Sequence, residues 1–151
     1  VNEEKLNTIE LSSTFVNEQV QKCRKKLEEG DYDGAITNAR SLLEGILLEI
    51  EYKITKEKGE NDDLPKMYKR VQKLLNLDPS DDNYSTTIKQ ILTGFVSIVN
   101  GISMLRNKMS DAHATNIKPD KHHAELAVNS AKTMLCFIVD TYNYQVKRNS
   151  L

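Results

Sequence analysis

The feature of this sequence that most constrains its fold is the spacing of apolar residues between positions 84 and 105. Large apolar side chains recur there at steps of three and four residues, the period of one face of an α-helix. They are Ile88, Ile91, Leu92, Phe95, Ile98, Val99, Ile102 and Leu105. A helix with so long an apolar face must bury it against other elements. Strand-like alternation persists nowhere in the chain, so we predict an all-α fold.

Other stretches carry the same period. A first helix is predicted over about 8–29, and Gly30 suits the left-handed position after its end. Asp31 or Asp33 can then cap a second helix, which continues to about Ile54. The apolar face of this second helix reads Ile36, Ala39, Leu43, Ile46, Leu47, Ile50 and Ile54.

Two more helices complete the pattern. A short one is predicted from Leu64–Pro65, with proline in the first turn, where its missing N–H does no harm. A final one is predicted from about Pro119. Its apolar face reads Leu126, Ala127, Ser130, Met134, Phe137, Ile138 and Tyr142. Four long helices and one short helix with brief connections predict an up-and-down helical bundle, in which residues 1–30 form an N-terminal helix packed on a domain of residues 31–151.

Composition restricts the class of protein. A chain of 151 residues suits one structural domain, and its 38% hydrophobic and 28% charged residues are typical of a soluble protein. No apolar run approaches the roughly 18 residues of a membrane span, and the start has no secretory signal pattern. We therefore expect a cytoplasmic protein without a membrane partner, with Cys23 and Cys136 as reduced thiols. The start also lacks methionine, which is compatible with a piece of a longer chain.

Charge gives no global attraction to nucleic acid, because the net charge is −1. Basic clusters occur at 22–26 and 66–73, and on helices such runs are usually solvated faces. Binding of a polyanion would therefore depend on a local site.

Arg106 and His113 are the candidate for such a site. On a continuous helix they would differ by about 20° around the axis and about 10 Å along it, so both would project to the same side. Arg106 falls one turn after Ile102, beside the apolar face. A guanidinium buried there without a partner would be strongly destabilising. The face is therefore predicted to open onto a cleft, a carboxylate or another subunit at this end.

The chemistry of the pair suits cleavage of RNA without a metal. A histidine with a pKa near neutral can take or give a proton, and an arginine can hold a phosphate bidentately and stabilise the transition state. The 2′-hydroxyl of RNA would be the nucleophile. Spacing alone favours the alternative, in which Arg106 pairs with Asp111 or Glu44 and His113 caps a helix.

Four ordered segments make the sequence resemble the abortive-infection C-terminal domain family of the HEPN superfamily of helical bundles. The resemblance covers about 31–142, and its segments are "ARSLLEGILLEI" (39–50), "LPKMYKRVQKLLNLDPS" (64–80), "ILTGFVSIVNGISMLRNKMSDAHA" (91–114) and "HAELAVNSAKTMLCFIVDTY" (123–142). The superfamily motif is an arginine followed by a polar residue and, after four to six residues in all, a histidine. Arg106, Asn107 and His113 match it. Relatives often have a basic residue before the last segment, where this chain has His122.

The resemblance implies a metal-independent endoribonuclease with its site at a homodimer interface, acting in antiviral defence or in a toxin–antitoxin system. An antitoxin or a sensor domain would be a possible partner. The resemblance makes residues 31–151 the HEPN-like domain, with Arg106 and His113 catalytic. The rival interpretation is a non-catalytic HEPN-like module of a larger defence protein that dimerises or binds a partner.

Further residues are assigned supporting roles. Asn107, Asp111 and Glu44 are predicted to support the catalytic pair, with Glu44 and Arg40 four residues apart and thus also suited to an ordinary ion pair. The residues predicted to contact substrate are Arg40, Lys108 and His123. His122 and His123 do not show ligand spacing with a nearby acidic residue, and neither a metal nor a cofactor is expected.

Overall fold

The computed structural model of the chain describes residues 11–82, 84–110, 118–148 and 151, and at 106–110 it describes the backbone alone. All the elements in these residues are helices. They are α2 (Ser13–Glu28), α3 (Tyr32–Thr55), α4 (Leu64–Leu74), α5 (Thr86–Ser110) and α6 (Lys121–Lys147). The prediction of an all-α fold with four long helices and one short helix is therefore confirmed.

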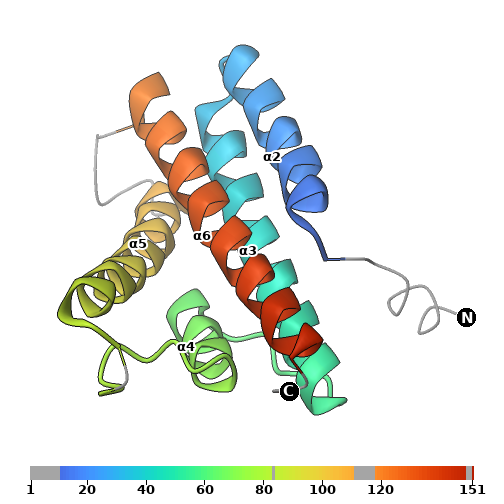
Figure 1. Ribbon diagram of the computed structural model, residues 1–151. Coiled ribbons are helices and arrows are strands. Elements are labelled where there is room, and N and C mark those ends of the chain that lie inside the picture. Colours follow the sequence, from blue (N-terminus) through green and yellow to red (C-terminus); the bar gives the residue numbers. More distant parts are fainter. Residues whose placement is uncertain (1–10, 83, 111–117, 149–150) are drawn as a thin grey trace, which may run out of the picture.

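Helix α3 is the centre of the arrangement. It contacts each of the four other helices, whereas α2 packs on α3 and α6, and α4 packs on α3 and α5. In Figure 1, α2, α3 and α6 run alongside one another, and α4 and α5 lie to one side of this group. The arrangement places the end of α5 near the start of α6.

Capping side chains explain the ends of the first two helices. Gly30 has a left-handed φ of 78°, as predicted, and the Asp31 carboxylate accepts a hydrogen bond from the Gly34 N–H at 2.9 Å. Asp31 is thus the cap of α3. The start of the first helix was predicted near residue 8. Instead, α2 begins at Ser13, because Ser12 is extended and its hydroxyl accepts a hydrogen bond from the Phe15 N–H at 3.1 Å.

The later helices begin close to the predicted positions. Asp63 caps α4 by accepting from the Lys66 N–H at 3.0 Å, and Pro65 lies in the first turn. Helix α5 begins at Thr86, where the hydroxyl of Ser85 accepts from the Ile88 N–H at 3.3 Å. Side chains before each helix therefore satisfy backbone donors that the first turn leaves free.

The hydrophobic core surrounds α3. Of its predicted apolar face, every residue except the half-buried Ile54 is buried. The fully buried side chains that meet it come from all four neighbours, and they include Val16, Leu64, Leu92, Met134, Leu135 and Ile138. Each large apolar side chain buried this way contributes roughly 1.5–3 kcal/mol, so α3 organises the bundle.

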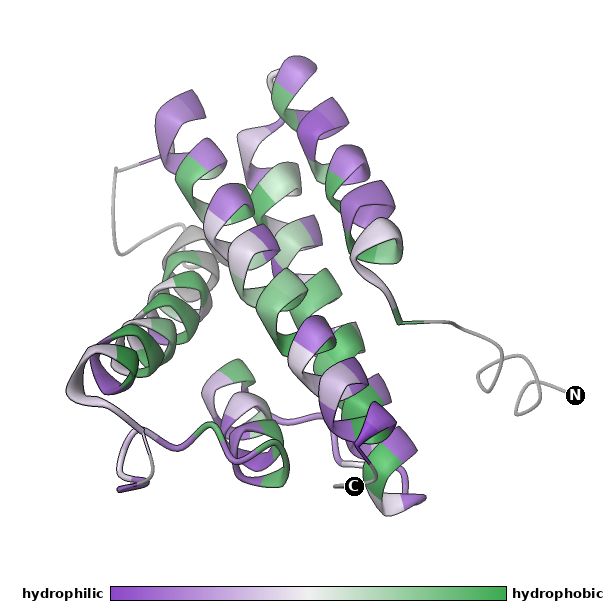
Figure 2. Ribbon diagram, viewed as in Figure 1, coloured by the Kyte–Doolittle hydropathy of each residue, from purple (hydrophilic) through white to green (hydrophobic). Residues whose placement is uncertain are grey.

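The apolar faces predicted for α5 and α6 are only partly buried, which corrects the sequence-based expectation. Ile91 on α5 is 53% exposed and Leu126 on α6 is 67% exposed, and Ile88 and Phe137 are exposed as well. The apolar arc of α5 is wider than the part that α3, α4 and α6 cover, and Figure 2 shows α5 apolar along most of its length. An apolar surface remains on these two helices.

Within α5, Thr86–Leu105 is long and apolar enough to cross a membrane by length and composition alone, with a mean hydropathy of 1.4. This finding corrects the expectation that no segment approaches spanning length. Thr93, Ser97 and Asn100 interrupt the apolar run, but Lys89 is the only charged residue in the segment. A core helix of a soluble protein passes the same criteria, so the absence of a membrane partner stays a prediction.

Two glycines should respond oppositely to alanine. Gly30→Ala is expected to lower the free energy of unfolding by about 1 kcal/mol, because alanine disfavours the left-handed region. Gly45→Ala in α3 is expected to raise it by up to about 1 kcal/mol, because alanine favours a helix and an added Cβ would have no neighbour within 4 Å. Urea unfolding followed by circular dichroism measures both changes, and a shift of the same sign for both variants would contradict this account.

Candidate active site

Arg40 of α3 is buried, and its guanidinium contacts both Glu44 on the same helix and the backbone of α5. The Arg40 side chain is 8% exposed, and its Nε donates to Glu44 Oε1 at 2.7 Å. Its Nη1 donates to the backbone carbonyl of Ser103 on α5 at 3.4 Å. The predicted i, i+4 ion pair is therefore confirmed, and it has an additional partner on α5 that spacing did not indicate. A buried guanidinium needs these partners, since an unpaired charge is costly away from water.

This contact restricts what Arg40 can do. Its guanidinium is bound to α3 and α5 and is almost out of solvent, whereas the Glu44 side chain is 21% exposed. In this arrangement Arg40 sets the position of α5 relative to α3. A direct contact of Arg40 with substrate stays a prediction, and it would require the ion pair to open.

The motif begins one turn beyond this contact. Ser103 is buried and precedes Arg106 by three residues, a rise of about 4.5 Å along the helix. The backbone is helical from Thr86 to Ser110, so Arg106, Asn107 and Lys108 stand on the continuation of α5. Their side chains, together with the whole of Asp111 and His113, lie outside the described residues. The convergence of Arg106 and His113 stays a prediction.

His123 lies in the first turn of α6 and is exposed. Its Nδ1 accepts a hydrogen bond from the backbone N–H of Asp120 at 3.1 Å, and its ring lies 4.0 Å from the ring of His122 between centroids. This hydrogen bond occupies Nδ1 and leaves Nε2 as the nitrogen available to a ligand. His123 thus caps the helix, and its predicted contact with substrate stays open through Nε2.

A groove of about 470 Å³ runs between the second half of α5 and the start of α6. Its lining is mainly apolar, and it includes Ile98, Gly101, Ile102 and Leu105 from α5, Pro119 before α6, and His123, Leu126, Ala127 and Ser130 from α6. Leu105 is the last side chain of α5 that the structure describes. The groove therefore opens on the apolar face of α5 at the end next to Arg106, where an opening was predicted.

Charged side chains of both signs lie where α6 begins. Lys118 and Lys121 are exposed there, and the Lys121 ammonium lies 4.0 Å from the Glu125 carboxylate at the limit of an ion pair. Arg24 of α2 reaches the same helix and donates to the Asn129 side-chain oxygen at 2.7 Å. The N-terminus of a helix also carries a partial positive charge. The carboxylates of Asp120, the N-cap of α6, and of Glu125 balance the two lysines.

The two cysteines and the acidic residues offer no competing centre in the part of the chain that the structure describes. Cys23 and Cys136 are free thiols, and burial raises the pKa of each, so neither is a ready thiolate nucleophile. Among the described residues, no three histidine, cysteine, aspartate or glutamate side chains are grouped to hold a metal ion. Because Asp111 and His113 lie outside those residues, the absence of a metal stays a prediction.

Sequence reasoning missed the parts of this site that depend on distant residues. The Ser103 carbonyl meets Arg40 across 63 positions of sequence, and the groove pairs α5 with α6 through Gly101 and Leu126. The steps of three and four residues along α5 were a usable signal for a second apolar face. They could not show which part of that face the chain itself would cover.

The comparisons with known proteins agree with the helical arrangement. A family model described as a HEPN-like domain, the abortive-infection C-terminal family, matches residues 14–142. Searches of curated proteins and of solved structures found no match. The matched region includes the Arg106–His113 motif and all but the first residue of α2.

The Arg40–Glu44 pair should be strongly coupled. Glu44→Ala is expected to lower the free energy of unfolding by about 2 kcal/mol, because it leaves a buried guanidinium with only the Ser103 carbonyl. Arg40→Leu combined with Glu44→Ala should cost less than the sum of the single changes, since no unpaired charge remains. A double-mutant cycle from urea unfolding measures the coupling, and additive single effects would show that the pair contributes no coupling energy.

Proposed function

This chain belongs to the abortive-infection C-terminal family of HEPN-like domains, and on that basis we propose that it is a metal-independent endoribonuclease domain of antiviral or toxin–antitoxin defence. One observation carries the proposal. The match to the family covers residues 14–142 and so includes Arg106, Asn107 and His113. The Arg40 guanidinium also contacts the Ser103 carbonyl of α5 at 3.4 Å, one turn before Arg106. A site that binds a phosphate must hold its side chains to within about 0.5 Å, and hydrogen bonds between neighbouring helices help to do so.

The proposed reaction uses the substrate's own nucleophile. The 2′-hydroxyl of RNA attacks the adjacent phosphorus while His113 takes its proton, so that an O2′–P bond forms and the P–O5′ bond breaks. The protonated His113 then gives a proton to the departing 5′ oxygen, which leaves as a hydroxyl. Arg106 binds the non-bridging phosphate oxygens and stabilises the charge that develops on them. The products are a 2′,3′-cyclic phosphate and a 5′-hydroxyl end. Asn107 hydrogen-bonds substrate or scaffold, and Asp111 orients His113.

Lysine and histidine side chains at the start of α6 support binding of the substrate strand beside this centre. Lys118 and Lys121 are exposed there, and His123 keeps Nε2 available while Nδ1 caps the helix. Phosphates bind readily at helix N-termini that also carry basic side chains. Together with Lys108, these groups give an RNA strand contacts on both sides of the α5–α6 connection.

A homodimer is the second part of the proposal, and the apolar seam of α5 supports it. We define this seam as Ile91, Gly94, Ile98, Gly101 and Leu105, which follow steps of three and four residues as in a heptad repeat. Ile91 is 53% exposed, and an added Cβ at Gly94 or Gly101 would have no neighbour within 4 Å among the described residues. A helix of a second copy can therefore approach the α5 backbone closely.

The seam also relates the dimer to the catalytic motif. It ends at Leu105, the residue directly before Arg106, and Leu105 and Gly101 also line the α5–α6 groove. A second copy seated on the seam would border the motif and exclude water from the apolar wall of the groove. Two sets of Arg106 and His113 would then face a shared cleft.

The same apolar surface favours the second candidate function. A HEPN-like module without catalysis would use the groove and the exposed Leu126 side chain to dimerise or to bind a partner protein. This candidate needs no histidine chemistry. Cleavage assays on His113 variants therefore distinguish the two functions.

His113→Ala is expected to lower the rate of RNA cleavage by about 10²- to 10⁴-fold, the usual contribution of a general acid–base group. Cleavage of total cellular RNA and of one defined oligonucleotide should be unaffected by EDTA. A 2′-deoxy substitution at the cleaved linkage should block it. His122→Ala is the control, because this exposed histidine has no assigned role in catalysis. Equal activity or equal inactivity of wild type and His113→Ala would favour the binding module.

Gly101→Arg should affect stability and assembly in opposite directions. Arginine favours a helix more than glycine does, so each subunit should unfold at higher urea concentration. The dimer should dissociate, because the large charged side chain would occupy the seam. Asn100→Arg adds the same charge on an exposed α5 position outside the seam and should leave the dimer intact. Sedimentation equilibrium measures the dimerisation of both variants, and urea unfolding measures their stability. If neither variant dissociates, the seam is ruled out as the interface.

A further inference from the structure

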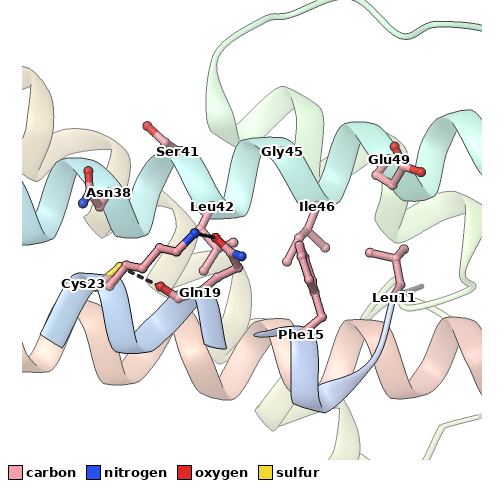
Figure 3. A pocket seen from close by; sticks show the side chains of 11 residues that line it. Leu11, Phe15, Gln19, Cys23, Asn38, Ser41, Leu42, Gly45, Ile46 and Glu49 are labelled. Carbon is pink, nitrogen blue, oxygen red and sulfur yellow. Dashed lines mark hydrogen bonds between the residues drawn. The ribbon is translucent and has the colours of Figure 1, made fainter. Parts of the chain in front are cut away.

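A second hollow lies between α2 and α3 and shares no lining residue with the α5–α6 groove. Its volume is about 450 Å³, within the range of small-molecule sites. Figure 3 shows this hollow, which is lined by Leu11, Phe15, Gln19, Lys22 and Cys23 from the α2 side and by Asn38, Ser41, Leu42, Gly45, Ile46 and Glu49 of α3. We call it the α2–α3 pocket. The proposed nuclease function does not use it.

Gly45 leaves the wall of this pocket open. A glycine inside a helix costs about 1 kcal/mol relative to alanine, and it is usually explained by another part of the chain that packs closely against it. Here an added Cβ would have no neighbour within 4 Å, and Gly45 is exposed. The described part of the chain therefore gains no packing from this glycine. What the glycine does provide is access to the backbone of α3 from the pocket.

The middle of the pocket is apolar and its two ends are polar. Phe15 of α2 and Ile46 of α3 face one another across the middle (Figure 3). At one end the Lys22 ammonium donates to the Gln19 side-chain oxygen at 3.4 Å. Glu49 lies at the other end. Asn38 and Glu49 are 11 positions apart on α3, which is about 16 Å along a helix, so the pocket suits an elongated molecule.

Glu49 is a carboxylate with unused acceptor capacity. Its side chain is 12% exposed, and its nearest cation is the Lys53 ammonium, 3.6 Å from Oε1. The buried Oε1 has no hydrogen-bond partner among the described residues. A largely buried carboxylate normally accepts several hydrogen bonds. The end of the pocket at Glu49 therefore favours a ligand that donates hydrogen bonds and carries positive charge.

We propose that the α2–α3 pocket binds a small elongated molecule with an apolar body and a terminal primary ammonium. The ammonium donates to the Glu49 carboxylate, the body lies between Phe15 and Ile46, and it contacts the α3 backbone at Gly45. Charge complementarity at Glu49 selects a cation over an anion or a neutral molecule. Binding at this place would be independent of RNA cleavage.

The test uses two fluorescent probes that differ only in charge. Dansylcadaverine has an aromatic body, a five-carbon chain and a terminal ammonium, whereas N-pentyl dansylamide lacks the ammonium. Titration of the whole chain should give a blue-shifted rise in fluorescence with dansylcadaverine and a dissociation constant of about 10 µM, estimated from ordinary ligand efficiency. The neutral probe should bind at least about tenfold more weakly, because it forms no charge-assisted hydrogen bond.

Two variants distinguish this site from general apolar binding. Gly45→Leu should abolish binding of both probes and raise the urea midpoint, because leucine fills the pocket and favours the helix. Glu49→Gln should remove the preference for the charged probe while the neutral probe binds as before. Glu18→Gln is the control, since Glu18 is an exposed carboxylate of α2 outside the pocket, and it should keep the preference.

Three results would overturn the proposal. Equal binding of both probes to wild type would show that charge is not recognised. Binding that survives Gly45→Leu would place the probe elsewhere. Absence of binding below about 1 mM, roughly a hundredfold weaker than expected, would exclude a small amine. Dissociation of the dimer by Gly45→Leu would then identify a second copy as the occupant.

Discussion

The structure depends on the burial of α3 by all four of its neighbours. One face of this helix, from Ile36 to Ile50, is buried and forms the centre of the core. Arg40 is the one charged residue of α3 that is buried, at 7% exposure. Its charge is compatible with the core because Glu44 and the Ser103 carbonyl accept its hydrogen bonds. The hydrogen bond to the Ser103 carbonyl, which compensates the buried charge, also links α3 to α5.

The incomplete coverage of α5 has consequences for function. Helix α4 has 11 residues against the 25 of α5, so the chain leaves part of the α5 face open. Apolar surface of this kind marks interaction sites. The α5 seam and the α5–α6 groove both lie on it, next to the start of the Arg106 motif. The Arg40–Ser103 contact and the exposed apolar surface thus lie at the same end of α5. The proposed catalytic interface between two copies would use both.

Much of the fold could be predicted from the sequence, because helix periods and caps are local. The starts of α3 and α4, the left-handed Gly30 and the Arg40–Glu44 pair follow from residues within four positions of one another. The predicted burial of Leu126 and Phe137 was wrong, because period alone gives the direction of an apolar face and not what covers it. The assignment of Arg106 and His113 came from the resemblance of ordered segments, since two residues seven positions apart are a weak signal by themselves.

The sequence by itself determined the helices, their order and the family, because apolar spacing and capping act over a few residues and the motif can be matched in order. Only the tertiary structure decided which apolar faces are covered. It brought Ser103 to Arg40 and formed the α5–α6 groove and the α2–α3 pocket. Among the described residues, it left no neighbour within 4 Å of an added Cβ at Gly45 or Gly101. These features depend on the lengths and crossing of helices far apart in the chain, and no local pattern encodes that packing.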